Sequence, residues 1–181
     1  MYLLIICTSQ KKNSKKQYRL SKYSLYLANK LNVKNSYMSY TYKYPMPSVT
    51  ADILVLRNTG VSSQILLIKR KNEPFKDCWA FPGGFTEEGE TLEQSASREL
   101  MEETGIDCQF LSQFKAFGDP GRDPRGRTVT IVFYVYVDED TEFHPADDAK
   151  EAAWFDLNNL PALAFDHAKI LEEFILAKHT A

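Results

Sequence analysis

Cysteines and long apolar runs are scarce in this sequence, and each absence excludes a class of protein. The cysteines, Cys7, Cys78 and Cys108, are odd in number and lack the paired spacing of a zinc site or a disulfide framework. No apolar stretch approaches the roughly 20 residues that cross a bilayer. The early run YLLIIC is also shorter than the apolar core of a signal peptide. We therefore predict a cytoplasmic protein without a membrane partner, whose cysteines are ordinary core residues.

Acidic residues are absent from the start of the chain. Nine of the 22 Lys and Arg residues precede Asp52, and none of the 24 Asp and Glu residues does. We expect residues 1–45 to form a basic extension, in which 20–31 is a candidate amphipathic helix. Three roles stay open for it: a nucleic-acid or membrane-surface arm, an organelle presequence, or an extension without a catalytic role. We do not expect nucleic acid to be a partner of the chain as a whole.

The remaining residues, 46–181, have the length of one domain, and the chain is 44% hydrophobic, enough for a filled core. Apolar patterns predict strands at 48–56, 64–70, 108–117, 128–137 and 152–157, and helices at 91–104 and 165–178. Strands and helices do not alternate strictly. The order therefore predicts an α/β sandwich around a mixed β-sheet.

The predicted helix at 91–104 has clear ends. Thr91 and Gln94 match a capping box, and Gly105 is placed to end the helix in a left-handed conformation. Apolar residues at every fourth position predict the buried stripe: Leu92, Ala96 and Leu100. The charged residues of this helix are therefore expected on another face.

Glu99, Glu102 and Glu103 share that other face, at the spacing i, i+3 and i+4. Neighbouring carboxylates repel one another and raise one another's pKa unless cations neutralise them. Hard divalent ions accept carboxylate oxygens, and Mg²⁺ shares its remaining positions with substrate phosphates. The cluster therefore indicates a magnesium site, with a solvated acidic helix face as the alternative.

Fixed positions on both sides extend this cluster into a longer motif. Its residues are Gly84, Glu90, Arg98, Glu99, Leu100, Glu102, Glu103, Gly105 and Ile106. In order and spacing the motif resembles the Nudix box, and the resemblance covers roughly residues 48–178. It implies a Nudix hydrolase with a Nudix-type α/β/α sandwich. Such an enzyme uses divalent metal to hydrolyse a nucleoside diphosphate that is linked to another moiety.

The resemblance also implies which residues bind the metal. The cofactor would be Mg²⁺ or Mn²⁺, as two or three ions when substrate is bound. Its ligands would be the backbone carbonyl of Gly83 and the side chains of Glu99, Glu102 and Glu103.

The same resemblance implies four catalytic residues: Glu90, Arg98, Glu99 and Glu103. Arg98 would pair with Glu90, because a guanidinium can orient carboxylates and offset their repulsion without occupying the metal position. The general base stays open between the two metal-binding glutamates, Glu99 and Glu103, and an acid further along the chain. The later candidates are Glu142, Asp147, Asp148 and Glu151.

Stretches outside the box, at 118–130, 147–161 and 164–167, resemble the branch assigned to ADP-ribose pyrophosphatases. The small-molecule nucleotide substrate would then be ADP-ribose, cut to AMP and ribose 5-phosphate. The resemblance also implies a possible homodimer, since ADP-ribose pyrophosphatases of this family commonly dimerise. One alternative is hydrolysis of oxidised nucleoside triphosphates, as in the MutT-like branch. The other is a non-catalytic ADP-ribose-sensing regulator, which would add a DNA-binding module after the last helix, whereas this chain ends at Ala181.

Arginines in the turn-rich segment 118–127 indicate a phosphate-binding loop. We expect Arg122 and Arg125, together with Arg70 at the end of a strand, to contact substrate. Asp119 and Asp123 would position these arginines. An exposed loop that is paired internally is the alternative.

Aromatic and imidazole side chains near the box have two interpretations each. Phe81 or Phe85 would stack on a nucleobase or belong to the core. His167, close to the last helix, is expected to be a structural hydrogen-bonding residue and not a metal ligand.

Overall fold

The computed structural model describes residues 42–144 and 149–179, and the candidate helix at 20–31 lies outside these ranges. The strands are β1 (Ser48–Asn58), β2 (Ser63–Arg70), β3 (Trp79–Ala80), β4 (Gly83–Phe85), β5 (Ser112–Phe117), β6 (Thr128–Tyr136) and β7 (Ala149–Asp156). The helices are α2 (Leu92–Thr104) and α3 (His167–His179). Within these two ranges, neither helix is long and apolar enough to cross a membrane.

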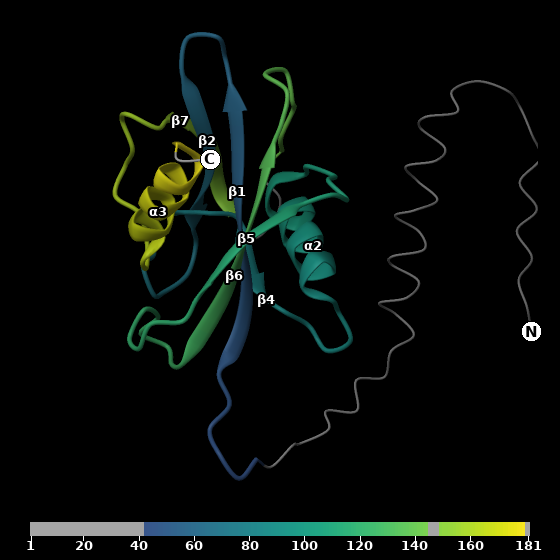
Figure 1. Ribbon diagram of the computed structural model, residues 1–181, viewed down its shortest axis with the longest axis vertical. Helices are drawn as coiled ribbons and strands as arrows, with labels where there is room; N and C mark the ends of the chain where they lie inside the picture. Colours follow the sequence, from purple (N-terminus) through teal and green to yellow (C-terminus); the bar gives the residue numbers. More distant parts are fainter. Residues whose placement is uncertain (1–41, 145–148, 180–181) are drawn as a thin grey trace, which may run out of the picture. The chain divides into compact units, whose positions relative to one another are not determined.

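The strands form one mixed sheet with β1 at its centre (Figure 1). One edge of β1 pairs in parallel with β6 along most of its length. Its other edge is shared, because the first half pairs antiparallel with β4 and the second half pairs antiparallel with β2. The sheet therefore divides between β2 and β4, and this division places the clefts of the candidate site.

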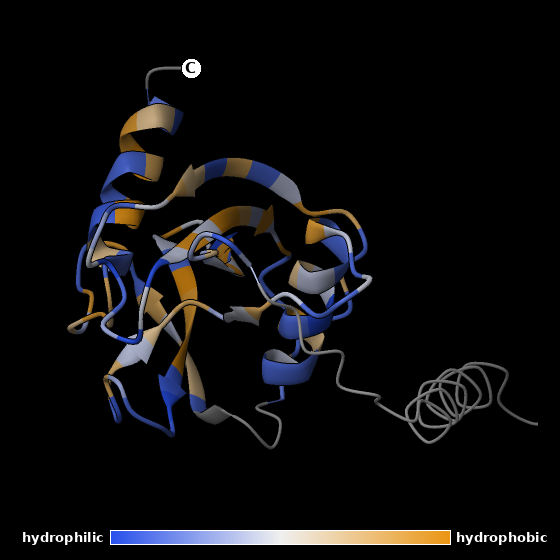
Figure 2. Cartoon of the chain, turned by 90° about the horizontal axis from the view of Figure 1, so that it is seen from below, coloured by the Kyte–Doolittle hydropathy of each residue, from blue (hydrophilic) through white to orange (hydrophobic). Residues whose placement is uncertain are grey.

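One helix covers each face of the sheet, as Figure 1 shows. Neighbouring residues of a strand point to opposite faces. In β1, Ile53 and Val55 pack on the side of α2, whereas Leu54 and Leu56 pack on the side of α3. Because both faces are covered, β1 is a continuous apolar run, and hydrophobic residues lie along the central strands in Figure 2. The predicted α/β/α sandwich around a mixed sheet is confirmed.

The ends of α2 follow the local signals in the sequence. The Gln94 N–H donates to the Thr91 side chain, and the Thr91 N–H donates to the Gln94 side chain, so the capping box is complete. Gly105 has a φ of 73°, and its N–H donates to the Met101 carbonyl. The predicted beginning and end of this helix are therefore correct to one residue.

The apolar patterns do not predict β3 and β4. These strands have two and three residues, too few to show a period, and they exist because their backbones pair with β2 and β1. β5 begins at Ser112 and not at 108, since its ladder with β6 starts with the pair Ser112–Tyr134. β7 begins at Ala149, earlier than the predicted 152, because it continues to pair along β2.

Candidate active site

Two adjoining clefts lie between β2 and β4, where the sheet divides. The first, which we call the acidic cleft, has a lining that includes Arg70, Gly84, Glu99 and Glu103. The second, which we call the aromatic cleft, has a lining that includes Asp52, Phe85, Arg125 and Phe165. Both linings contain Ile68, Arg70 and the residues of β4. A ligand that is longer than either cleft can therefore occupy both.

Glu103 lies where α2 meets β4. Its Oε2 accepts a hydrogen bond of 2.8 Å from the Gly83 N–H. Burial raises the pKa of Glu103 to about 8, the Gly83 hydrogen bond opposes this shift, and the charges of Glu99 and Asp52 add to it. A cation beside Glu103 would restore the charged form, so this carboxylate fits the role of a metal ligand.

Gly84 makes room for the carboxylate of Glu99. A Cβ at position 84 would lie 2.5 Å from Glu99 Oε1 and 2.6 Å from Glu99 Cδ, so only glycine permits this approach. Burial raises the pKa of Glu99, against the hydrogen bond and the charge of Arg98. Glu99 is therefore a second oxygen donor at the acidic cleft whose charge is not fully compensated, which is the chemistry that a hard divalent ion requires.

Arg98 connects the carboxylates of the box. Its Nε and Nη2 donate to the two oxygens of Glu90 at 2.6 and 3.0 Å, so the predicted pair is present. Its Nη1 donates to Glu99 Oε1 at 2.7 Å and to Glu102 Oε2 at 3.2 Å. The hydrogen bond from Arg98 holds the pKa of Glu90 below its usual value. Arg98 therefore fixes the orientation of Glu99 and offsets the repulsion among the glutamates.

Glu102 differs from the other predicted metal ligands. Its side chain is 38% exposed and accepts a bond from Arg98, and it is not part of the lining of the acidic cleft. Within residues 42–144 and 149–179, no three acidic, His or Cys side chains gather closely enough to hold one ion. Glu99 and Glu103 fit a divalent ion by their chemistry, and the Gly83 carbonyl and Glu102 stay predicted ligands.

Arg122 is committed to a partner within the protein. Its side chain is 4% exposed, and its Nε and Nη2 donate to Asp166 at 2.9 and 2.7 Å. Arg122 contributes to the lining of the aromatic cleft. Its bidentate pair with Asp166 takes up two of the donors that we expected to contact substrate, and a contact between Arg122 and substrate stays a prediction.

Arg125 is the arginine of this loop that faces the aromatic cleft with part of its surface open. Asp123 accepts from its Nε at 3.0 Å and from its Nη2 at 2.7 Å, as expected for a positioning acid. Burial raises the pKa of Asp123, but the hydrogen bonds from Arg125 outweigh burial and hold it below its usual value. The guanidinium of Arg125 lies 4.8 Å from the ring centroid of Phe85 and 5.4 Å from that of Phe165. This position fits the predicted contact with substrate.

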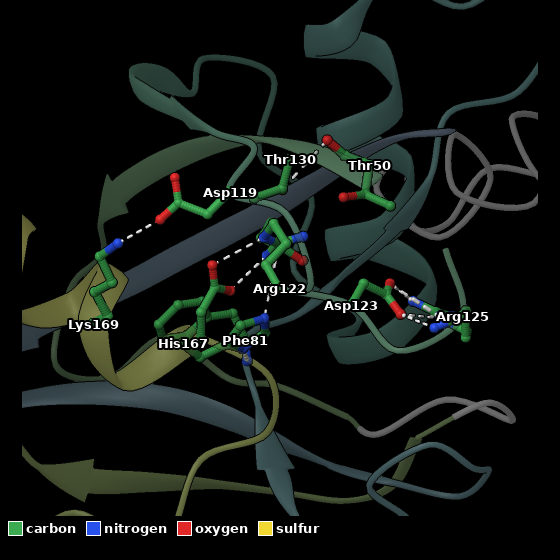
Figure 3. Close-up of polar contacts among 11 residues, drawn as sticks. Thr50, Phe81, Asp119, Arg122, Asp123, Arg125, Thr130, His167 and Lys169 are labelled. Atoms are coloured by element: carbon green, nitrogen blue, oxygen red, sulfur yellow. Dashed lines mark hydrogen bonds and ion pairs between the residues drawn. The ribbon is translucent and has the colours of Figure 1, made fainter. Parts of the chain in front are cut away.

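Asp119 forms its ion pair with a lysine of α3. Its Oδ2 accepts a bond of 2.6 Å from Lys169 of α3, and its side chain is exposed (Figure 3). It is also outside the linings of both clefts. The fold brings Lys169, 50 positions away in the chain, to this carboxylate, a partner that the sequence does not predict, and a substrate role for Asp119 stays a prediction.

Arg70 belongs to both clefts, at the end of β2. Its Nε donates to the Pro74 carbonyl at 2.9 Å, and its guanidinium lies 4.7 Å from the ring centroid of Phe165. Burial lowers the pKa of Arg70, and the nearby charge of Arg125 adds to this effect. The charges of Glu103, Asp123 and Asp52 act on Arg70 in the opposite direction, so the junction of the clefts contains both signs of charge, and its guanidinium groups are the donors that a diphosphate can use.

Phe81 belongs to the core, and His167 has the expected structural role. The two rings are buried and stack with centroids 4.3 Å apart. The Phe81 N–H donates to His167 Nδ1 at 3.0 Å (Figure 3). Burial lowers the pKa of His167, so the ring is neutral at pH 7 and carries its proton on Nε2. Phe85 is exposed enough to stack on a ligand.

The later acids that lie in the described part of the chain do not line either cleft. Glu142 is exposed, and Glu151 pairs with Lys69 at 3.3 Å; neither contributes to the lining of the two clefts. Asp147 and Asp148 lie outside the described residues. The general base therefore stays open between Glu99, Glu103 and the later acids, of which Glu142 and Glu151 would have to move to reach the clefts.

Two residues of the aromatic cleft, Asp52 and Phe165, have no role assigned from the sequence, although Phe165 belongs to the stretch 164–167. Asp52 is an acid inside the apolar strand sequence ADILVL, and this interruption is a signal that marks it. Phe165 has a φ of 53°, a left-handed conformation that the sequence does not predict.

Comparison with known proteins identifies a family and its relatives. The model of the NUDIX domain matches residues 46–174. An ADP-ribose pyrophosphatase of Methanocaldococcus jannaschii is 48% identical over 136 residues, which are 75% of this chain and 78% of that protein. The ADPR responsive transcriptional repressor NtrR of Acinetobacter baylyi is 36% identical over 134 residues, which are 72% of this chain and 54% of the repressor.

A solved structure agrees with these matches. The NUDIX domain of Shewanella oneidensis NrtR, complexed with ADP ribose, superposes with a TM-score of 0.69 and 28% sequence identity. The match covers 85% of this chain and 97% of that domain. The similarity therefore extends over the clefts as well as the box.

Proposed function

This chain belongs to the NUDIX domain family, and from this membership we propose that it hydrolyses ADP-ribose to AMP and ribose 5-phosphate. The observation that supports the substrate most strongly is the 48% identity with the M. jannaschii ADP-ribose pyrophosphatase over 78% of that protein. The acidic cleft supplies the groups for a metal-dependent hydrolase, and the adjoining aromatic cleft supplies aromatic and arginine side chains for the rest of a nucleotide.

Nudix hydrolases generally use divalent metals, and Glu99 and Glu103 would hold them here, with Glu102 and the Gly83 carbonyl as further ligands. The ions would be Mg²⁺ or Mn²⁺, two or three of them once substrate is present, because a diphosphate adds negative charge to a site that already contains carboxylates. When bound, these ions provide Lewis-acid stabilisation of the charge that develops on the diphosphate.

The protein's own residues prepare the acidic cleft in advance. Arg98 fixes Glu99 through a bond of 2.7 Å, and the Gly83 N–H fixes Glu103 through a bond of 2.8 Å. Groups that are oriented before the reaction need no reorganisation while charge develops. Glu99 or Glu103 would also accept the proton of the attacking water, unless one of the later acids does so.

Arg70 and Arg125 would hold the substrate where the clefts meet. Arg70 contributes to both linings, and Asp123 keeps the guanidinium of Arg125 over the aromatic rings. A diphosphate near Arg70 would have one end in the acidic cleft and the other end in the aromatic cleft. Bidentate donation from a guanidinium suits phosphate oxygens better than the point charge of a lysine.

The experiment that tests this proposal identifies products across a panel of substrates. The purified protein is incubated with Mg²⁺ and ADP-ribose, NADH, diadenosine polyphosphates or oxidised nucleotides. We expect equal amounts of AMP and ribose 5-phosphate from ADP-ribose, at the highest kcat/KM of the panel. Pyrophosphate release from an oxidised triphosphate as the preferred reaction would replace this substrate with that of the MutT-like alternative.

The similarity to a repressor gives a second candidate function, an ADP-ribose-binding regulator that does not cleave its ligand. The chain spans 54% of that repressor, so the match concerns the NUDIX part of a longer protein. Here Glu99, Glu103 and Arg98 are all in place at the acidic cleft. We therefore expect turnover, and binding of ADP-ribose without any turnover would favour the regulator.

Location and oligomeric state stay predictions. The odd number of cysteines and their wide spacing favour the cytoplasm, as a reducing compartment. The resemblance to ADP-ribose pyrophosphatases favours a homodimer, which light scattering on the purified protein tests.

A further inference from the structure

We propose that Asp52 determines specificity by accepting a hydrogen bond from the exocyclic amine of the adenine base. This inference rests on the proposed function, since it takes ADP-ribose as the substrate and places its base in the aromatic cleft. It adds a residue of β1 that lies outside the box and outside the arginine-rich loop.

Asp52 is a buried acid with spare capacity to accept hydrogen bonds. It is 8% exposed and belongs to the lining of the aromatic cleft. Arg122 Nη2 and His167 Nε2 each lie 3.8 Å from its Oδ2, which is longer than a hydrogen bond. An ionised carboxylate can accept about four hydrogen bonds. Arg122 and His167 therefore lie near the Asp52 carboxylate, but neither is close enough to donate a hydrogen bond to its Oδ2.

These neighbours are held in place by other partners. Arg122 donates from Nε and Nη2 to Asp166 at 2.9 and 2.7 Å. His167 is held through its Nδ1, which accepts the Phe81 N–H at 3.0 Å. A ligand that donates to Asp52 completes its set of bonds, whereas a ligand that presents an acceptor meets a buried carboxylate and pays the desolvation cost without a bond.

The sides of the aromatic cleft suit a flat ring. The guanidinium of Arg125, itself planar, lies over the rings of Phe85 and Phe165 at 4.8 and 5.4 Å. Phe165 keeps this place in a left-handed conformation, φ 53°, and its ring contacts Phe75 with centroids 4.8 Å apart. A bulky residue in this region of φ is strained, and such strain persists where the surroundings fix the side chain.

The position of the acidic cleft sets the direction of the substrate. Its carboxylates lie at the end where the diphosphate reacts, and Arg70 and β4 connect it to the aromatic cleft. The end of the substrate that enters the aromatic cleft needs a flat face for stacking and a donor for Asp52. Adenine has both, whereas the terminal ribose has donors and no π face. Hypoxanthine presents a carbonyl acceptor where adenine has its amine, so Asp52 should discriminate between these two bases.

Two pairs of ligands test this inference. We expect wild-type protein to bind AMP about 10- to 100-fold more tightly than IMP, and to show a similar ratio of kcat/KM between ADP-ribose and inosine diphosphate ribose. In Asp52→Asn the amide can donate as well as accept, so both ratios should fall toward 1. Titration calorimetry measures the binding ratio, and product formation measures the other.

Two further variants distinguish recognition of the base from a general loss of nucleotide affinity. Phe165→Leu should weaken AMP and IMP equally and leave their ratio unchanged, because stacking does not depend on the amine. Glu173→Gln removes a surface carboxylate that pairs with Lys115, and it should change neither affinity. Thermal unfolding shows whether Asp52→Asn is folded; if it is not, the wild-type ratio alone decides.

Equal affinities for AMP and IMP in the wild type would overturn the role of Asp52. An equal loss for both ligands in folded Asp52→Asn would also overturn it, since Asp52 would then contact a donor that both share, such as a ribose hydroxyl. The proposed function fails separately: a protein that prefers AMP to IMP but does not cleave ADP-ribose refutes the hydrolase and keeps the base contact.

Discussion

Replacing Glu103 with Gln separates the metal chemistry of this residue from its effect on folding. The Gln side chain keeps the shape of Glu, and its Oε1 can still accept the Gly83 N–H, a bond of 2.8 Å in the wild type. The charge that burial disfavours is removed. We expect Glu103→Gln to lose at least about 100-fold in activity and to gain stability when no metal is present.

The size of this gain follows from the pKa of Glu103. Burial raises it from 4.5 to about 8, and each pKa unit corresponds to about 1.4 kcal/mol. The folded state therefore disfavours the charged form relative to the unfolded state. The resulting loss of stability is absent below pH 4.5, grows between pH 4.5 and about 8, and is complete above that. At pH 9 it amounts to roughly 3–5 kcal/mol, which the variant avoids.

Urea denaturation in EDTA, at several pH values from 5 to 9, measures this difference. The two proteins should be similar at pH 5, and the variant should be the more stable one at pH 9. Mg²⁺ at 100 times its Kd should stabilise the wild type by about 2.7 kcal/mol and leave the variant unchanged. The surface variant Glu173→Gln serves as the control. A Glu103→Gln protein that is less stable than the wild type at pH 9 in EDTA would refute the reasoning.

Three other substitutions or truncations test separate parts of the structure. Gly84→Ala should reduce activity by at least about 100-fold with the fold retained by circular dichroism, because its Cβ would lie 2.5 Å from Glu99 Oε1; near wild-type turnover would contradict this. Arg125→Ala should raise the KM for ADP-ribose, or lower kcat if the contact forms only in the transition state; unchanged kinetics would return the loop to a structural role. A chain that starts at Met38 should fold and hydrolyse substrate normally, and an inactive or insoluble product would mean that residues 1–37 pack against the domain or against a partner subunit.

Local signals explain why α2 and its acidic face are predictable from the sequence. The capping residues Thr91 and Gln94 and the terminating Gly105 act within one turn of the residues that they affect. The spacing of Glu99 and Glu103 follows from the helix itself. Arg98 and Glu90 are eight positions apart, and their pairing is predicted from the resemblance to the Nudix box.

Partners that are distant in the chain explain what the sequence does not predict. Arg122 meets Asp166 across 44 positions, and Asp119 meets Lys169 across 50. No periodicity reports which acid will face which base after folding. β3 and β4 are likewise set by pairing with β2 and β1 and not by their own residues. Asp52 interrupts an apolar strand in the sequence, but its place in a site follows only from the folding that puts β1 beside the aromatic cleft.

The most direct test of the assigned activity is competition between two substrates in one reaction. ADP-ribose and an oxidised deoxyguanosine triphosphate are mixed at equal concentrations with the protein and Mg²⁺, and the products are followed over time. We predict that AMP and ribose 5-phosphate accumulate first, in equal amounts, and that Glu103→Gln abolishes both. Faster release of pyrophosphate from the oxidised triphosphate would contradict the assignment of ADP-ribose as the substrate.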